Sequence, residues 1–310
     1  MEIIRLGHNH SVTFTDEIVA TIGEFDGIHI AHQMLFKKTL ELSSKYNKKS
    51  AVITFDPHPD LVLGKNDYLL LSASDKIDII SKYGFDYLFI IEFDDNILSM
   101  SHFDFVKKYL LKLNVVHLVV GFDFRYGYKG LGNCSTLNGD SEGKIDVVVV
   151  DEQMFNNNKI GSSYIKKLLS DGLVKEANQL LGRYFKLSGY IIHGKNIGEK
   201  IKVPTANLKI DYDSTILKQG VYAGYCYVNG EKYISICNIG HNPSFNYRSD
   251  LSYEIHILND GFNNKIYDEF VELELVEYLR EEIVFQNITE FQKQIIEDKK
   301  RAISILNNAL

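Results

Sequence analysis

One stretch decides the fold, Thr21-Ile-Gly-Glu-Phe-Asp-Gly-Ile-His-Ile-Ala-His-Gln33. An apolar run over residues 18–22 leads into it, and Gly23 and Gly27 then break the run as they do in a turn. Apolar side chains recur after the turn at helical spacing, at Ala31, Leu35, Phe36, Leu40 and Leu42. The pattern predicts a strand, a glycine turn and a helix over residues 31–46. Backbone N–H groups and the helix dipole meet at such a turn, which suits a phosphate group.

His29 and His32 lie three residues apart, so they share a face of the first helical turn. Two imidazoles at the amino end of a helix can stabilise negative charge on a triphosphate. The alternative is that they only cap the helix or lie on its surface. Two histidines alone do not make a zinc site, because zinc takes three or four ligands.

Composition narrows the class of protein. A length of 310 residues predicts about two domains, and 45% hydrophobic and 24% charged residues are typical of a soluble globular protein. The net charge of −7 argues against a nucleic-acid binder but leaves nucleotide binding open. Cys134, Cys226 and Cys237 form no CxxC pair, which favours a reducing cytoplasm. We expect no signal peptide and no membrane span, because no apolar run approaches about 20 residues.

The N-terminal half alternates between strand and helix patterns. Uninterrupted apolar runs, typical of strands buried on both faces, occupy residues 51–55, 87–91, 115–120 and 145–150. Amphipathic segments lie between them, at residues 31–46, 74–83 and 102–113. This alternation predicts an α/β fold of the Rossmann-like type with a doubly wound parallel sheet. Three polar turns that follow strands should meet at its carboxyl edge: Gly23-Glu-Phe-Asp26, Asp56-Pro-His-Pro59 and Gly121-Phe-Asp-Phe124.

A further helix start lies at Ser162 and Ser163, with a helical run over residues 164–169. Its hydroxyl and amide groups could hold phosphate, with Lys166 adding charge, but taken alone the two serines are better explained as a plain N-cap. A second helix over residues 171–181 is predicted to end at Gly182 as its C-cap.

The pattern changes after residue 184. Short strands are predicted over residues 188–193, 221–228, 233–237, 253–258 and 270–275. Asn229-Gly230 is a strong hairpin signal, and closely spaced antiparallel strands predict a small β-barrel. A terminal helix follows, for which Thr289 and Gln292 fit a capping box. The predicted domains are therefore residues 1–184 and residues 185–310.

Blocks in order along nearly the whole chain resemble the bacterial bifunctional riboflavin kinases/FAD synthetases. In the N-terminal half, the similar blocks are Gly23-Glu-Phe-Asp-Gly-Ile-His-Ile-Ala-His32, Ile53-Thr-Phe-Asp-Pro-His-Pro59 and Gly121-Phe-Asp-Phe-Arg-Tyr-Gly127. In the C-terminal half they are Leu181-Gly-Arg183, Gly189-Tyr-Ile-Ile-His-Gly194, Val203-Pro-Thr-Ala-Asn-Leu208, Gly220-Val-Tyr-Ala223, Asn238-Ile-Gly-His-Asn-Pro243 and Glu254-Ile-His256.

The resemblance implies FMN adenylyltransferase activity in residues 1–184, with FMN attacking the α-phosphorus of ATP and pyrophosphate leaving. It implies an ATP site with His32 and His29 as catalytic groups, formed by Gly23, Phe25, Asp26, His29, His32, Ser162, Ser163 and Lys166. It implies a flavin side formed by Phe55, Asp56, Pro57, His58, Asp123, Phe124 and Arg125. Core packing is the alternative role for the two phenylalanines.

The resemblance implies riboflavin kinase activity in residues 185–310, with ATP phosphorylating the riboflavin 5′-hydroxyl. Glu254 matches the catalytic glutamate, which takes the hydroxyl proton. Gly194, Thr205 and Asn207 match the ATP site, and the latter two match the ligands of Mg²⁺. Arg280 matches an arginine near the flavin or the phosphates. Without the family, these residues fit an ordinary loop and an exposed surface equally well.

The implied substrates are ATP, riboflavin and FMN, with FMN and FAD as substrate and product instead of prosthetic groups. Flavin-acceptor apoproteins are expected as transient partners, and nucleic acid and membrane are not. The alternative is a riboflavin kinase whose N-terminal domain only holds flavin or nucleotide. It is motivated by departures from the family pattern at Ala31, Tyr164 and Lys166.

Overall fold

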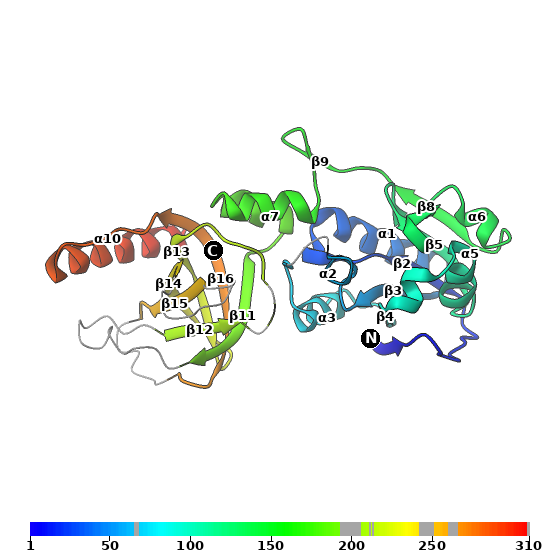
Figure 1. The fold of residues 1–310 in the computed structure, drawn as a ribbon, viewed down its shortest axis with the longest axis horizontal. Coiled ribbons are helices and arrows are strands. Elements are labelled where there is room, and N and C mark those ends of the chain that lie inside the picture. The colour runs from blue at the N-terminus through cyan, green and yellow to red at the C-terminus, as the bar shows by residue number, and fades with distance from the viewer. Residues whose placement is uncertain are drawn as a thin grey trace. The chain divides into compact units, whose positions relative to one another are not determined.

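The computed structural model describes residues 1–64, 68–192, 206–210, 212, 214–241, 251–259 and 266–308. The chain forms two compact units. Unit 1 consists of Met1–Asp67 and Ala73–Ser162, and unit 2 consists of Tyr68–Ser72 and Ser163–Leu310. Unit 1 contains an open sheet with helices, and unit 2 contains a barrel with a long terminal helix (Figure 1). The functional boundary after residue 184 stays a prediction.

Unit 1 is organised by a six-stranded sheet in which every neighbouring pair is parallel. Its order is β1-β4-β3-β2-β5-β8. The strands are β1 (Glu2–Leu6), β2 (Ile18–Ile22), β3 (Lys49–Asp56), β4 (Tyr87–Glu92), β5 (Val115–Gly121) and β8 (Asp146–Val150). All residues of β2 are buried, which explains its uninterrupted apolar sequence. The predicted parallel α/β sheet is confirmed.

The position of β2 determines where a ligand can bind. β2 pairs with β3 on one side and with β5 on the other. The chain therefore reverses its direction across the sheet at β2, and such a switch point opens a crevice at the carboxyl ends of the strands. The turns after β2, β3 and β5 lie next to one another at this edge, as predicted.

Helices and short strands complete unit 1. The helical elements are η1 (Asp26–Ile28), α1 (Ile30–Tyr46), α2 (Pro59–Val62), α3 (Ala73–Ser81), α4 (Asp95–Ser99), α5 (His102–Phe105), η2 (Val106–Leu111), η3 (Tyr128–Gly130) and α6 (Leu137–Asp140). The segment predicted as one helix over residues 102–113 begins as α5 and continues as the π-helix η2. Two small antiparallel pairs join β6 (Arg125–Tyr126) to β7 (Gly132–Asn133) and β9 (Met154–Phe155) to β10 (Asn158–Lys159).

Unit 2 contains two helices, a closed antiparallel barrel and a last helix. These elements are α7 (Ser162–Ser170), α8 (Val174–Leu181), β11 (Phe185–Ile192), β12 (Ala206–Ile210), β13 (Gly220–Val228), β14 (Glu231–His241), β15 (Leu251–Ile257), β16 (Phe270–Arg280) and α10 (Ile288–Asn307). Gly182 ends α8 with φ of 66°, the left-handed C-cap that was predicted. Asn229 and Gly230, with φ of 51° and 82°, form the predicted hairpin turn between β13 and β14.

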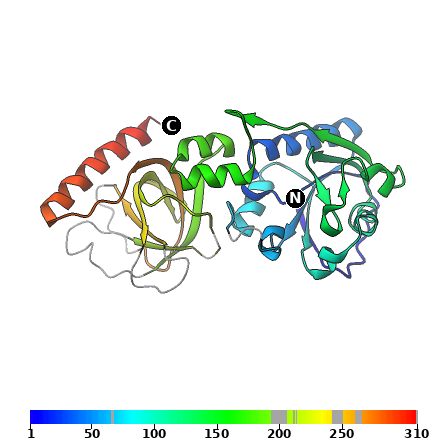
Figure 2. The same ribbon diagram turned by 45° about the horizontal axis from the view of Figure 1, so that its top comes forward.

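The barrel has the strand order β11-β12-β15-β14-β13-β16 and closes by pairing β16 with β11. Helix α10 lies along the barrel (Figure 2) and packs on β13, β14 and β16. Its Ala302 and Leu306 are buried in a core with Val221 and Ala223, and Tyr225 donates a hydrogen bond to the carbonyl of Leu306 at 2.7 Å. No helix among the described residues is long and apolar enough to cross a membrane.

The predicted cap of the terminal helix is wrong by two residues. Asn287 is the N-cap of α10, and its side chain accepts a hydrogen bond from the N–H of Glu290 at 2.9 Å. Glu290 in turn accepts one from the N–H of Gln286 at 3.3 Å. Asn287 and Glu290 thus cap the helix, instead of Thr289 and Gln292.

Candidate active sites

The turn over residues 23–29, which is predicted to bind ATP and is called the ATP turn below, connects β2 to α1 and contains His29, one member of the histidine pair. His29 is the N-cap of α1, and its Nδ1 accepts a hydrogen bond from the backbone N–H of His32 at 3.3 Å. The two imidazoles are stacked, with centroids 3.6 Å apart and 19° between their planes. Phe25 stands edge-on to His32, with centroids 5.2 Å apart. One histidine therefore caps the helix, and both rings lie together at its amino end.

The surroundings of His32 keep it neutral. Burial lowers its pKa well below 6.5, and the positive charges of His29 and Lys76 lower it further. The residue as a whole is half-buried, but its Nδ1 has no accessible surface and no hydrogen-bond partner among the described residues. A phosphate group would bring negative charge to the ring and favour its protonated form. His32 can thus take up a proton as phosphate charge arrives.

The segment over residues 55–58, which is predicted to face the flavin and is called the flavin turn below, starts in the last two residues of β3 and brings His58 beside Glu24 of the ATP turn. His58 is 5% exposed; its Nδ1 accepts a hydrogen bond from the N–H of Asp60 at 3.2 Å, and its Nε2 lies 3.6 Å from Oε2 of Glu24. Ligand atoms of Glu24, His58 and Asp60 lie within 4.8 Å of one another, close enough to hold a metal ion. An Nδ1 that accepts a hydrogen bond leaves the proton on Nε2, however, and a protonated nitrogen does not bind a metal. We interpret the cluster as a polar link between the two turns.

The other members of the flavin turn differ in exposure. Asp56 forms an ion pair with Arg5, with 2.8 Å between Oδ2 and Nη1. Phe55 is half-buried against the core and stands edge-on to Phe93, with centroids 5.6 Å apart. Pro57 is exposed and follows a cis peptide bond. Phe55 therefore has the packing role that was its alternative interpretation, while part of its ring remains accessible.

The turn after β5 contains the remaining predicted flavin residues. Asp123 forms an ion pair with Lys159 of β10. Phe124 is half-buried and stacks on Tyr126, with centroids 5.5 Å apart and 18° between the rings. Arg125 is exposed. At this turn, the guanidinium of Arg125 remains accessible to a phosphate or a flavin.

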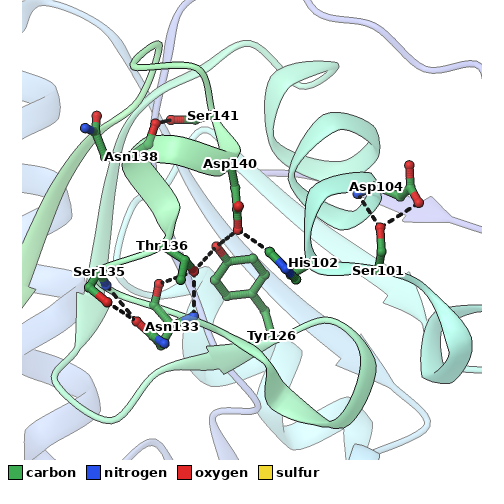
Figure 3. Close-up of polar contacts among 10 residues, drawn as sticks. All are labelled: Ser101, His102, Asp104, Tyr126, Asn133, Ser135, Thr136, Asn138, Asp140 and Ser141. Atoms are coloured by element: carbon green, nitrogen blue, oxygen red, sulfur yellow. Dashed lines mark hydrogen bonds and ion pairs between the residues drawn. The ribbon is translucent and has the colours of Figure 1, made fainter.

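A buried polar network around Tyr126 supports the segment that follows β5. Figure 3 shows the carboxylate of Asp140, at the end of α6, between Tyr126 and His102. Its Oδ2 accepts a hydrogen bond from the Tyr126 hydroxyl and lies 2.7 Å from Nδ1 of His102. Tyr126 also lies 3.0 Å from the hydroxyl of Thr136. Burial and the bond to Asp140 raise the pKa of Tyr126, so its hydroxyl stays protonated and remains a donor.

Lys76 and this network are not evident from the sequence. Lys76 lies in α3 and is 8% exposed, and its Nζ donates to backbone carbonyls of the ATP and flavin turns. It is four residues before the buried Ile80, so a charged residue on the apolar face of the predicted helix was its only signal. The network joins three segments that only the tertiary fold brings together.

The residues predicted at the start of α7 divide between the two units. Ser162 belongs to unit 1, and its hydroxyl donates to the carbonyl of Asp26, a buried residue of the ATP turn, at 2.8 Å. Ser163 is exposed and belongs to unit 2. Lys166, also in unit 2, donates to the carbonyl of Tyr68 at 2.7 Å. The hydroxyl of Ser162 thus supports the backbone of the ATP turn.

The barrel places three polar residues on one face of neighbouring strands. Glu254 of β15 pairs in register with Asn207 of β12 on one side and with Asn238 of β14 on the other. The amide of Asn238 donates to Oε1 of Glu282 at 3.1 Å. Burial raises the pKa of Glu254, and the negative charge of Glu282 raises it further. A carboxylate with a raised pKa is a stronger base for an alcohol proton.

The structure says less about the other residues predicted for the kinase site. Gly194 and Thr205 lie outside the described residues. The guanidinium of Arg280 is bonded to Asp298 of α10, with 2.7 Å between Nη2 and Oδ2. Arg280 therefore holds the terminal helix, and its role toward the flavin stays a prediction.

Comparisons with known proteins match each half of the chain to a family. The sequence model described as FAD synthetase matches residues 12–164, and the one described as riboflavin kinase matches residues 181–306. A bifunctional riboflavin kinase/FMN adenylyltransferase from Bacillus subtilis (strain 168) is 34% identical over 99% of both chains. One from Listeria monocytogenes is 36% identical over 94% of this chain and 95% of its own.

A solved structure shares the fold of the whole chain. It is described as a macrolide-efflux protein from Streptococcus pneumoniae, and it matches with a TM-score of 0.88 and 26% identity over 97% of this chain and 98% of its own. The two family matches, the similarity over almost the full length and the two sites lead to one assignment. This chain belongs to the family of bifunctional riboflavin kinase/FMN adenylyltransferases.

Proposed function

We propose that this enzyme phosphorylates riboflavin with ATP to give FMN and then adenylylates FMN with a second ATP to give FAD and pyrophosphate. One observation carries the proposal: a single chain contains two separate groups of side chains that suit phosphate transfer. Unit 1 has the stacked His29 and His32 at the amino end of α1, and unit 2 has Glu254 beside Asn207. The order of the reactions follows, because FMN, the product of the site in unit 2, is the substrate of the site in unit 1.

The two sites differ because their nucleophiles differ. The riboflavin hydroxyl must lose a proton as it attacks the γ-phosphorus, and Glu254 is the proposed acceptor of that proton. Its raised pKa and its register with Asn207 support this role. The new O–P bond forms as the bond from the γ-phosphorus to its bridging oxygen breaks, and ADP leaves. The FMN phosphate is already an anion near pH 7, because a phosphate monoester has a second pKa of about 6. Its attack on the α-phosphorus requires no base.

In adenylyl transfer, the groups of the ATP turn act by binding and charge stabilisation. The backbone N–H groups at the start of α1 and the paired imidazoles face the negative charge that builds up on phosphate oxygens. His32 starts neutral and becomes a stronger hydrogen-bond donor when it takes up a proton. The flavin turn and exposed Arg125 would orient FMN, so that its phosphate lies in line with the leaving pyrophosphate.

Magnesium is the cofactor that we propose for the kinase site. The amide oxygen of Asn207 and the carboxylate of Glu254 are hard oxygen donors on one face of the barrel, which fits the ion. Asn207, together with Thr205, would hold it. When bound, Mg²⁺ supplies positive charge that offsets charge on the ATP phosphates.

The proposed setting is the cytoplasm, which the free thiols of Cys134, Cys226 and Cys237 support. The proposed partners are ATP, riboflavin and FMN, with transient handover of flavin to apoproteins that use it. A kinase with an inactive unit 1 is not favoured, because the FAD synthetase match covers residues 12–164. The stacked histidines and the neighbouring positions of β2, β3 and β5 support an active unit 1.

Three proteins test the function: wild type, His32→Ala and Glu254→Ala, each supplied with riboflavin and Mg-ATP and followed by chromatography. We expect wild type to make FMN and then FAD. His32→Ala should accumulate FMN, and Glu254→Ala should lose FMN formation by about 10² to 10⁴-fold while still converting added FMN to FAD. Accumulation of FMN alone by wild type, where a control synthetase completes the reaction, would refute bifunctionality.

A further inference from the structure

Lys76 is a buried cation between two loops that the reaction uses. It lies in α3, where its side chain is 8% exposed. Its Nζ donates to the carbonyl of Glu24 at 3.1 Å and lies 3.4 Å from the carbonyl of Phe55, a second hydrogen bond. Glu24 belongs to the ATP turn and Phe55 to the flavin turn. One ammonium group therefore joins the two turns.

The hydrogen bonds of Lys76 lie just beyond the last backbone pairing between β2 and β3. Ile22 pairs with Ile53 in the last register position of β2 and β3, and the N–H of Gly23 still donates to the carbonyl of Ile53 at 3.1 Å. Glu24 and Phe55 come directly after this point. Beyond the ladder, Lys76 supplies a link between the turns through two hydrogen bonds to an ionised donor, which are stronger than neutral ones.

Packing alone does not account for a lysine here. Removing an ammonium group from water is costly, and burial lowers the pKa of Lys76, while Asp26, Asp56 and Glu24 oppose that shift. A methionine of similar length fills such a space without that cost. The charge is thus placed at an energetic cost beside the ATP turn, close enough to affect the pKa of His32.

We propose that Lys76 is a positioning residue for adenylyl transfer, which ties the ATP turn to the flavin turn and thereby sets the separation between the α-phosphorus of ATP and the phosphate of FMN. The inference rests on the proposed function. A direct grip on ATP phosphates is less consistent with the contacts, because the side chain is buried and the protein carbonyls already occupy two of its three N–H groups. In-line attack depends steeply on separation, since a misplacement of about 1 Å can cost about 100-fold in rate.

The test compares Lys76→Met with wild type in the full chain, using FMN and Mg-ATP, and determines kcat and KM for both substrates. We expect kcat for FAD formation to fall about 100-fold, as for a misplaced nucleophile, with little change in KM for ATP. Kinase activity in the same protein should match wild type. Lys82→Met is the matched control, because Lys82 is exposed one residue after α3, and it should behave as wild type. Lys76→Arg keeps the charge and should recover part of kcat.

Other outcomes overturn the inference. A raised KM for ATP with unchanged kcat would make Lys76 a substrate-binding group, and wild-type kinetics would leave it without a role. If Lys76→Met lowers the melting temperature of unit 1 and loses ATP binding, Lys76→Gln decides, because its amide is cheaper to bury but too short to reach both carbonyls. A folded Lys76→Gln with wild-type kcat refutes positioning. Failure of wild type itself to make FAD would refute the proposed function instead.

Discussion

Arg280 and Asp298 form a bidentate ion pair between the last barrel strand and the terminal helix. Nε of Arg280 lies 3.0 Å from Oδ1 of Asp298, and Nη2 lies 2.7 Å from Oδ2. The Asp298 side chain is 4% exposed and that of Arg280 is 17% exposed, so solvent screens the pair little. Gln294 donates a further hydrogen bond to Oδ1 at 3.0 Å. The pair fixes α10 against β16.

Asp298→Ala should therefore destabilise unit 2 strongly. Removing one partner leaves a largely buried guanidinium unpaired, which costs about 3 kcal/mol. Urea unfolding followed by kinase activity measures this loss. Glu297→Ala, an exposed neighbour on α10, is the control and should be close to wild type. A large rise in KM for riboflavin at unchanged stability would instead support the flavin role predicted for Arg280.

Glu282→Gln should shift the acid limb of the kinase pH profile to lower pH. Burial raises the pKa of Glu254, and the charge of Glu282 raises it further, so the base is lost by protonation at a higher pH than an ordinary carboxyl group. Removing the second charge lowers the pKa of Glu254, and activity should persist further into the acid range. Measurement of kcat against pH for both proteins checks this. An unmoved acid limb would show that another group controls it.

Asp140→Asn should weaken FMN binding in unit 1 without affecting the kinase. The substitution removes the charge that accepts hydrogen bonds from Tyr126 and His102, each worth about 1.5 to 3 kcal/mol. The turn that bears Phe124 and Arg125 should then lose its support, and KM for FMN in FAD formation should rise. Ser135→Ala alters an exposed hydrogen bond in the same region and serves as the control. Equal KM values in the two variants would contradict a supporting role for the network.

Acid should destabilise unit 1 partly through His32. Its folded pKa lies well below the 6.5 of an ordinary histidine, so between these two values the unfolded chain binds more protons than the folded one. Stability is complete above about pH 6.5 and declines as the pH falls toward the folded pKa. His32→Phe should flatten this dependence. Thermal unfolding between pH 7.5 and 5.5 measures it, and parallel curves for variant and wild type would exclude the contribution.

The parallel sheet could be predicted because its central strands are buried on both faces. Their sequences are therefore uninterrupted apolar runs. β1 was not predicted, because it is an edge strand that exposes Glu2 and Ile3 and, among the described residues, pairs with β4 alone. The cap of α10 was misplaced because two overlapping segments satisfy the same rule, and a local aromatic contact distinguishes them. Phe285 packs edge-on against Phe291, with centroids 5.3 Å apart, which favours the earlier start.

In the candidate sites, too, some features could be predicted from the sequence and others could not. The ATP turn could be predicted, because strand, glycines and histidines are contiguous in the chain. The roles of Lys76, Asp140 and His102 could not be predicted, because they depend on contacts between segments that are far apart in the sequence. Arg280 illustrates the reverse case, since a motif position alone did not reveal that Asp298 occupies its guanidinium.

The closure of the barrel has a consequence for how unit 2 folds. Its first strand, β11, pairs with its last, β16, so Phe185 meets Leu275 only after nearly the whole unit has been gathered. Such distant pairing folds slowly. Until β16 inserts, β11 and β13 each keep an open edge able to pair with another chain. The arrival of β16 is therefore the event that protects the half-formed barrel from aggregation.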